Sequence, residues 1–95
     1  MKAYHVTPRR NKASIMKHGL LTHFAVSVPG TTGFVTRRGV PWMVGFIREL
    51  HGERDVCVLY VNVGRTRPPP HYLRMFRIAR DIPPEKILGE LAWED

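Results

Sequence analysis

The 95-residue sequence contains a single cysteine and no long apolar run. With only Cys57, the chain cannot form an internal disulfide, and a zinc site built from several cysteines is excluded. Cys57 lies in an apolar stretch, where we expect the thiol to be buried and unreactive. No segment approaches the roughly 18–20 apolar residues that span a bilayer. The first ten residues lack the apolar core of a signal peptide, so we expect no membrane segment and a cytoplasmic location.

Acidic residues are also few, and they are unevenly placed. Eight Asp and Glu residues oppose 15 Lys and Arg residues, which gives a formal net charge of +7. Residues 1–48 and 56–80 contain no acid, so all eight acids fall within 49–55 and 81–95. Coulomb attraction and counterion release then favour an anionic partner, namely a nucleotide pyrophosphate, a nucleic acid or an acidic protein. A charged surface that serves only solubility is the alternative.

Apolar periodicity and turn residues divide the chain into short elements, with no repeat, linker or low-complexity tract. We expect strands over 2–6, 23–28, 34–36, 56–63 and 72–79, and helices ending at 18, over 40–51 and over 82–87. Ninety-five residues hold one hydrophobic core, so the chain forms a single domain, residues 1–95. Few helices among several short strands favour an α+β fold with mixed or antiparallel pairing.

The first strand and the first helix carry specific expectations. Alternation places Tyr4 and Val6 on one strand face, and Ala3 and His5 on the other. Either Thr7, followed by Pro8, or Asn11 caps the helix. Gly19 supplies the left-handed position after the last helical residue, and Leu20 supplies the hydrophobic contact that follows. The helix residues expected to be buried are Ala13, Ile15 and Met16.

The segment 40–51 has the clearest helical pattern. Val40, Met43, Val44 and Ile47 recur at helical spacing and predict a stripe that packs on the core. The residues expected to widen this stripe are Phe46 and Leu50.

Several short motifs resemble ADP-ribosyltransferase-like proteins. The opening motifs are Tyr4-His5-Val6-Thr7, Ser14-Ile15 and Gly19-Leu20, and later segments similar to the family are 34–36, 56–63 and 80–87. The similarity therefore spans nearly the whole chain, although each piece is short. It implies a small ADP-ribosyltransferase-like fold, with a split sheet of mixed or antiparallel strands and two main helices. DNA-modifying toxins and RNA 2′-phosphotransferases share this opening, so it selects no substrate.

The resemblance implies a site for NAD at the opening strand. In it, His5 binds a ribose hydroxyl, and backbone groups of Val6 and Thr7 hold the nicotinamide amide. An imidazole offers one donor and one acceptor at neutral pH, which suits a hydroxyl partner. A strand histidine without any ligand is the alternative.

Phe34, Thr36 and Arg9 complete the cofactor site that the resemblance implies. Phe34 stands where the family stacks a Tyr on nicotinamide; plain core packing is the alternative. Thr36 faces the same cleft or is an ordinary strand residue. Arg9, with Arg10, is a candidate for binding the pyrophosphate near the start of the first helix, or else lies on a solvated face.

The sequence departs from the family at the catalytic position. NAD-dependent transfer requires a Glu on a late strand, which stabilises the cationic ribose. That position falls near 74–76, where no carboxylate occurs, and Asp81 is our candidate substitute. A phosphotransferase would instead place arginines around a phosphate, for which Arg37, Arg74 and Arg77 are available.

Three functions therefore remain open at the level of sequence. The chain is an enzyme that transfers ADP-ribose from NAD to a nucleic acid or protein, or a module that binds NAD, ADP-ribose or a related nucleotide without chemistry. The third is a basic interaction module for nucleic acid or a partner protein. The missing carboxylate disfavours the first function, and the retained His5 motif disfavours the third.

Overall fold

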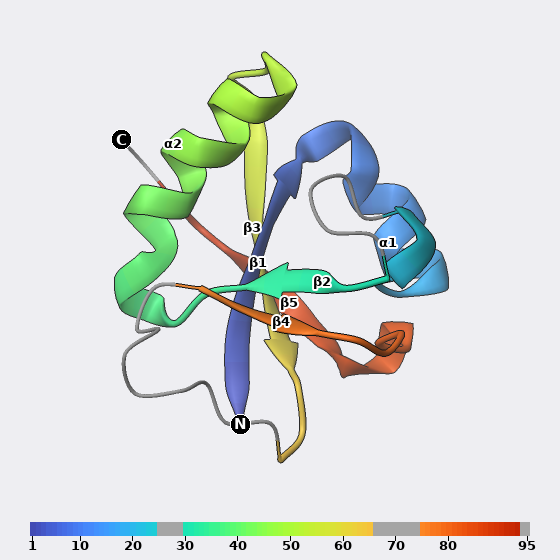
Figure 1. The fold of residues 1–95 in the computed structure, drawn as a ribbon. Coiled ribbons are helices and arrows are strands. Elements are labelled where there is room, and N and C mark those ends of the chain that lie inside the picture. The colour runs from blue at the N-terminus through green and yellow to red at the C-terminus, as the bar shows by residue number, and fades with distance from the viewer. Residues whose placement is uncertain (25–29, 66–74, 94–95) are drawn as a thin grey trace.

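The structure, a computed structural model, describes residues 1–24, 30–65 and 75–93 (Figure 1). Within them the strands are β1 (Lys2–Pro8), β2 (Thr32–Phe34), β3 (Val56–Asn62), β4 (Phe76–Ile78) and β5 (Ile87–Leu91), and the α-helices are α1 (Lys12–His18) and α2 (Val40–His51). Short 3₁₀ turns cover Arg9–Asn11, Thr22–Phe24, Arg37–Gly39 and Pro84–Lys86. The two helices and two antiparallel sheets confirm the expected α+β class. Neither helix of this described part is long and apolar enough to cross a membrane.

The two sheets are a three-stranded one, ordered β1-β3-β5, and a two-stranded one, β2-β4. β1 and β3 pair over seven residues, from Lys2–Asn62 to Pro8–Val56. The sheets meet at an isolated bridge, where the N–H groups of Tyr4 and Val35 each donate to the other residue's carbonyl, at 2.9 and 2.8 Å. In Figure 1, β2 and β4 cross β1 at this point. The bridge therefore sets the small sheet against the first strand.

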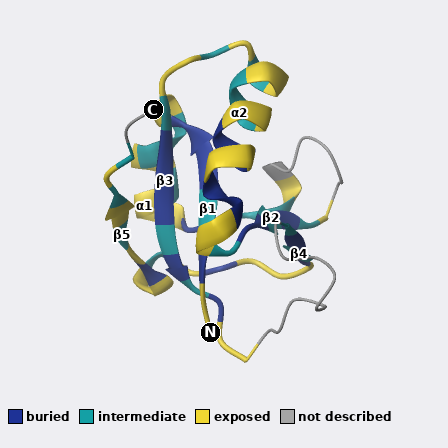
Figure 2. Ribbon diagram, turned by 90° about the vertical axis from the view of Figure 1, so that its left-hand side faces the viewer, coloured by how far each residue is buried: buried dark blue, intermediate teal, exposed yellow. Residues whose placement is uncertain are grey.

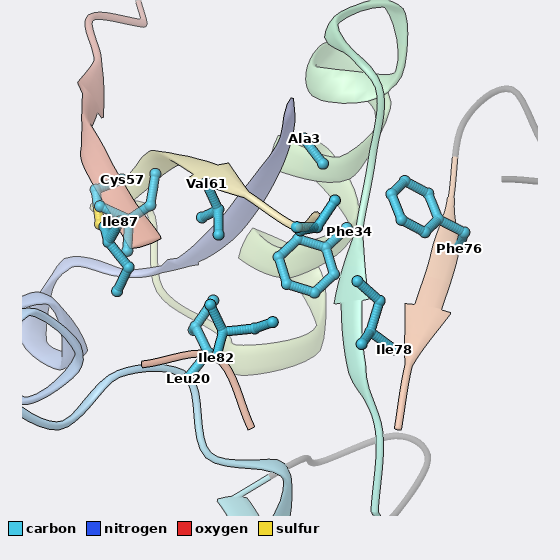
Figure 3. Close-up of a cluster of buried hydrophobic side chains, with 11 residues drawn as sticks. Ala3, Leu20, Phe34, Cys57, Val61, Phe76, Ile78, Ile82 and Ile87 are labelled. Carbon is cyan, nitrogen blue, oxygen red and sulfur yellow. The ribbon is translucent and has the colours of Figure 1, made fainter. Parts of the chain in front are cut away.

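The core lies on both faces of the main sheet, as the alternation in β1 predicts. Ala3 belongs to a cluster with Phe34, Phe76 and residues of β3 (Figure 3), whereas Tyr4 and Val6 pack with α2 on the opposite face. The predicted faces of the first strand are thereby confirmed.

The apolar stripe of α2 is confirmed for the residues that face the sheet. Val40, Met43 and Val44 are buried and Ile47 is partly buried against them. The expectation that Phe46 and Leu50 widen the buried stripe is wrong, since they are 38% and 44% exposed. α2 contacts β1 and β3 through one ridge, and its outer face points to solvent (Figure 2).

One expected element is wrong, and a second is wrong at its first two residues. The terminal helix over 82–87 is instead the 3₁₀ turn Pro84–Lys86 followed by strand β5, which pairs with the open edge of β3. Pairing with an exposed strand edge outweighs the local helical signal. Of the strand expected over 23–28, His23 and Phe24 lie in the turn Thr22–Phe24, and 25–28 fall outside the described residues. Asp81 stabilises this turn, because its carboxylate accepts hydrogen bonds from both the N–H and hydroxyl of Thr22.

The start of the first helix also differs from the expectation. α1 begins at Lys12 after a 3₁₀ turn, and neither proposed capping side chain bonds the helix backbone. Instead, the Asn11 amide donates to the Thr7 hydroxyl at 3.2 Å. Because α1 is short and touches the core mainly through Ile15, Ala13 and Met16 are exposed, contrary to expectation.

Gly19 ends α1 with a positive φ, as predicted, although its ψ of −171° is extended and not left-handed helical, and it also allows a long-range contact. Its φ is +84°, and its N–H donates to the Ile15 carbonyl at 2.7 Å. The next residue, Leu20, forms an antiparallel bridge with Ile82, with N–O distances of 2.8 and 2.9 Å. A Cβ on Gly19 would lie 2.1 Å from the Ile82 carbonyl oxygen. The glycine is therefore required by both conformation and space.

We expect Gly19→Ala to destabilise the fold by on the order of 3 kcal/mol, because it combines left-handed strain with a backbone clash. Gly52→Ala is the matched control. Gly52 has φ +66° but nothing within 4 Å of the place that a Cβ would take, so strain alone should cost about 1 kcal/mol. Urea denaturation followed by circular dichroism measures both; equal losses would contradict the clash.

Candidate functional site

A pocket of about 480 Å³ lies between β1, α1, α2 and the small sheet. This volume is in the range of sites that hold small molecules. The pocket is lined from several elements by residues that include His5, Val6, Thr7, Arg10, Asn11, Ser14, Thr32, Gly33, Phe46 and Arg77. Three of the predicted site residues, His5, Val6 and Thr7, are therefore brought together on its wall.

The His5 imidazole is fixed by one hydrogen bond across the two sheets. Its Nδ1 lies 2.8 Å from the Gly33 carbonyl oxygen. A carbonyl can only accept, so Nδ1 carries the hydrogen and Nε2 of the neutral ring is an acceptor. Burial lowers the pKa of His5 below its usual value, and the Gly33 carbonyl opposes this to a smaller extent. At neutral pH the ring is therefore uncharged and its tautomer is determined.

The acceptor atom of His5 is accessible. Among the described residues, Nε2 has no hydrogen-bond partner. Every buried side-chain N or O atom of these residues does have one. Nε2 must therefore reach solvent, and the pocket is the surface that His5 lines. A hydroxyl donor in the pocket could bond to this atom.

Gly33 connects His5 with a cation on the neighbouring strand. Gly33 pairs with Arg77 in the β2–β4 register, and both residues line the pocket. Arg77 Nη1 lies 3.8 Å from the place of a Cβ on Gly33. Since Phe76 and Ile78 are buried, strand alternation directs Arg77 to the opposite face. The neutral imidazole of His5 and the guanidinium of Arg77 thus lie on either side of Gly33, which has no side chain.

The structure separates Arg9 from Arg10. The Arg9 guanidinium is 3.0 Å from both Asp55 and Glu90 carboxylate oxygens, and Arg9 does not line the pocket. Hydrogen bonds from Arg9 and Lys12 lower the pKa of Glu90. Arg10 does line the pocket, and its guanidinium is 2.5 Å from Glu53. Of this pair, Arg10 is thus the one placed to meet a ligand anion.

Phe34 and Thr36 do not line the pocket. Phe34 is 1% exposed, with its ring between those of His5 and Phe76, at centroid distances of 5.7 and 5.9 Å (Figure 3). This position corresponds to the core-packing alternative, in which Phe34 supports the back of the imidazole. Thr36 is half-buried, and its carbonyl accepts from Gly39 in the turn before α2.

Asp81, the candidate catalytic acid, is exposed and does not line the pocket. Its bonds from the backbone N–H and the hydroxyl of Thr22 lower its pKa. Among the described residues that line the pocket there is no Asp or Glu. Nor does this part of the chain hold three His, Cys, Asp or Glu side chains grouped for a metal ion. The pocket wall is thus largely apolar, and the charged side chains that line it are basic.

Of the arginines that the phosphotransferase alternative offered, Arg77 lines the pocket, Arg37 does not, and Arg74 falls outside the described residues. Sequence reasoning missed several other residues of the wall. Asn11, Ser14 and Thr32 carry no distinctive signal, since polar residues of this kind occur in any turn or short helix. Phe46 lines the pocket from α2, where periodicity alone could not distinguish a core position from a pocket rim.

Cys57 is buried as expected, and burial is the main cause that raises the pKa of its thiol. The fold and site together define a small α+β domain of two antiparallel sheets with one basic pocket described. Comparison of the chain with known protein families, with curated proteins and with solved structures finds no match.

The lowered pKa of His5 predicts a pH dependence of stability. In the unfolded chain His5 takes up a proton near pH 6.5, while the folded ring stays neutral to lower pH. The unfolded state then binds more protons, so stability should fall as pH drops below about 6.5, by at most about 1.4 kcal/mol per pH unit from this group. His5→Gln should flatten the decline. Thermal unfolding between pH 5 and 8 checks this, and an unchanged slope would contradict it.

Proposed function

We propose that this protein is an ADP-ribosyltransferase-like domain that binds NAD, ADP-ribose or a related nucleotide in the pocket beside β1. The observation that carries the proposal is the His5 imidazole, held through Nδ1 by the Gly33 carbonyl with Nε2 accessible in the pocket. A ribose hydroxyl that donates to Nε2 completes the hydrogen bonding of the ring. Packing alone would not require a polar ring at this position.

The charges of the pocket support an anionic ligand. Arg10 lines the pocket from the turn before α1, and Arg77 lines it from β4. Guanidinium groups bind phosphate oxygens through bidentate hydrogen bonds. The Arg10–Glu53 pair is largely exposed, with side-chain exposures of 61% and 34%. Exposed pairs of this kind contribute only about 0–1 kcal/mol. Arg10 can therefore leave Glu53 and bind a ligand phosphate at little cost in free energy.

The arrangement of the family-like motifs gives further support. The resemblance implies a split antiparallel sheet with two main helices, and the described chain has two antiparallel sheets and two α-helices. Gly19-Leu20 and Ile82-Pro83, which are far apart in the sequence, lie in contact through the Leu20–Ile82 bridge. Motifs that resemble one family at both ends of the chain thus form one structural unit.

The proposed activity is binding without transfer. A cationic ribose transition state needs a nearby carboxylate, and the described pocket wall contains none. Just after positions 74–76, where the resemblance places the catalytic Glu, β4 presents Arg77 to the pocket. A cation there attracts phosphate but opposes a developing positive charge.

We expect calorimetry to detect NAD or ADP-ribose binding and His5→Ala to weaken it by on the order of 1–3 kcal/mol, roughly 5- to 150-fold, because one ribose hydrogen bond is lost. Arg77→Gln should weaken it as well. Lys86→Gln removes the same charge from an exposed residue outside the pocket lining and should leave the affinity unchanged.

No binding of either nucleotide by the unmutated protein would overturn the proposal. If nucleic acid instead bound with a steep salt dependence that His5→Ala did not alter, the basic interaction module would be the better description.

A transfer assay with labelled NAD separates the binder from an enzyme. We expect no transfer to protein or nucleic acid by the unmutated protein, and unchanged nucleotide affinity in Asp81→Ala, since Asp81 lies outside the pocket lining. Transfer that disappears in Asp81→Ala would show that this carboxylate is catalytic and that the binding-only proposal is wrong. The Thr22 contacts make a stability check of the variant necessary.

A further inference from the structure

Gly33 is a glycine in the interior of a strand. It is the middle residue of β2 and lies between Thr32 and Phe34, which are both buried. Glycine weakens a strand, because it loses the most conformational freedom on folding and has no side chain to pack. A glycine at such a position is therefore expected to meet a requirement of the backbone, of the packing or of a ligand.

Neither the backbone nor the packing requires glycine at position 33. The φ of Gly33 is not positive, so other residues can adopt its conformation. A Cβ at this position would have one neighbour within 4 Å among the described residues, Arg77 Nη1, at the ordinary contact distance of 3.8 Å. Gly19 differs in both respects, since its φ is +84° and its Cβ would clash with backbone. The fold thus has room for a side chain at position 33.

The missing side chain leaves space in the pocket between two polar groups. Because Thr32 and Phe34 are buried, strand alternation directs a side chain at position 33 to the other face, and Gly33 lines the pocket. Its carbonyl oxygen lies 2.8 Å from His5 Nδ1, and Arg77 is its cross-strand partner. A strand glycine without a packing role is typical of a place where a ligand approaches the backbone closely.

We infer, on the basis of the proposed nucleotide function, that Gly33 determines which ligands the pocket accepts, because the ribose of the ligand lies directly against its Cα. In this position a ribose hydroxyl donates to His5 Nε2, and the attached phosphate lies toward Arg77. A ribose phosphate carries both groups on one small ring, so it matches the space above Gly33. Any side chain at position 33 would occupy the place of the sugar.

Gly33→Ala tests the inference, because it adds one methyl group at the place of the sugar. Calorimetry with ADP-ribose should show an affinity lower by about tenfold or more, since overfilling a packed site is costly. Thermal unfolding followed by circular dichroism should show an unchanged or higher Tm, because alanine fits this backbone without a clash.

Gly45→Ala is the matched control. Gly45 lies within α2, outside the pocket lining, and nothing lies within 4 Å of the place of its Cβ. The same added methyl should raise Tm by about 4–8 °C through better helix propensity. The affinity for ADP-ribose should stay unchanged.

A double variant shows whether one sugar contacts both His5 and Gly33. If the methyl of Gly33→Ala displaces the ribose, the hydrogen bond to His5 is already lost. His5→Ala added to Gly33→Ala should then weaken ADP-ribose binding by less than about twofold more. Losses that multiply in the double variant would place the sugar away from one of the two residues and overturn the inference.

The remaining outcomes separate this inference from the proposed function. A Gly33→Ala variant that binds ADP-ribose as tightly as the unmutated protein would overturn the inference and leave the proposed function intact. A lower Tm in Gly33→Ala would also overturn it, since packing would then account for the glycine. No binding by the unmutated protein would be the failure of the proposed function itself, and the inference would fail with it.

Discussion

The backbone pair Tyr4–Val35 is the contact on which the arrangement of this molecule depends. Its two hydrogen bonds join the small β2-β4 sheet to β1, and the pocket lies where the two sheets meet. Without it, the Gly33 carbonyl would have no fixed relation to His5, and Arg77 would not face the same space. Seven pairs between β1 and β3 hold the other side of β1, so the strand that carries His5 is anchored from both edges.

The site combines a neutral hydrogen-bond acceptor with cations, and burial explains the first of these properties. Burial lowers the pKa of the imidazole, which packs against Phe34, and keeps the ring uncharged, although its bond to the Gly33 carbonyl acts in the opposite direction. An acceptor for a hydroxyl and donors for phosphate can thus coexist in one small pocket, which is the combination that a ribose phosphate presents.

The charges of the protein serve more than one purpose. Arg9, Lys12, Asp55 and Glu90 form a surface network between the start of α1 and β5, and this network explains why Arg9 is not available to the pocket. Asp81 stabilises the Thr22 turn, and Glu53 pairs with Arg10. Four of the eight acids thus bond to residues distant in the chain, and none of the described residues that line the pocket is acidic.

The sequence by itself determined the features that local periodicity and turn chemistry encode. These are the two faces of β1, the buried ridge of α2, the glycine end of α1 and the buried Cys57. Tertiary structure decided where elements pair: 87–91 became a strand because β3 offered a free edge, and His23 and Phe24 became a turn because Asp81 lay beside Thr22. It also decided that Arg10, and not Arg9, lines the same pocket as His5, together with Gly33 and Arg77. Those outcomes depend on contacts between residues distant in the chain, which no local pattern specifies.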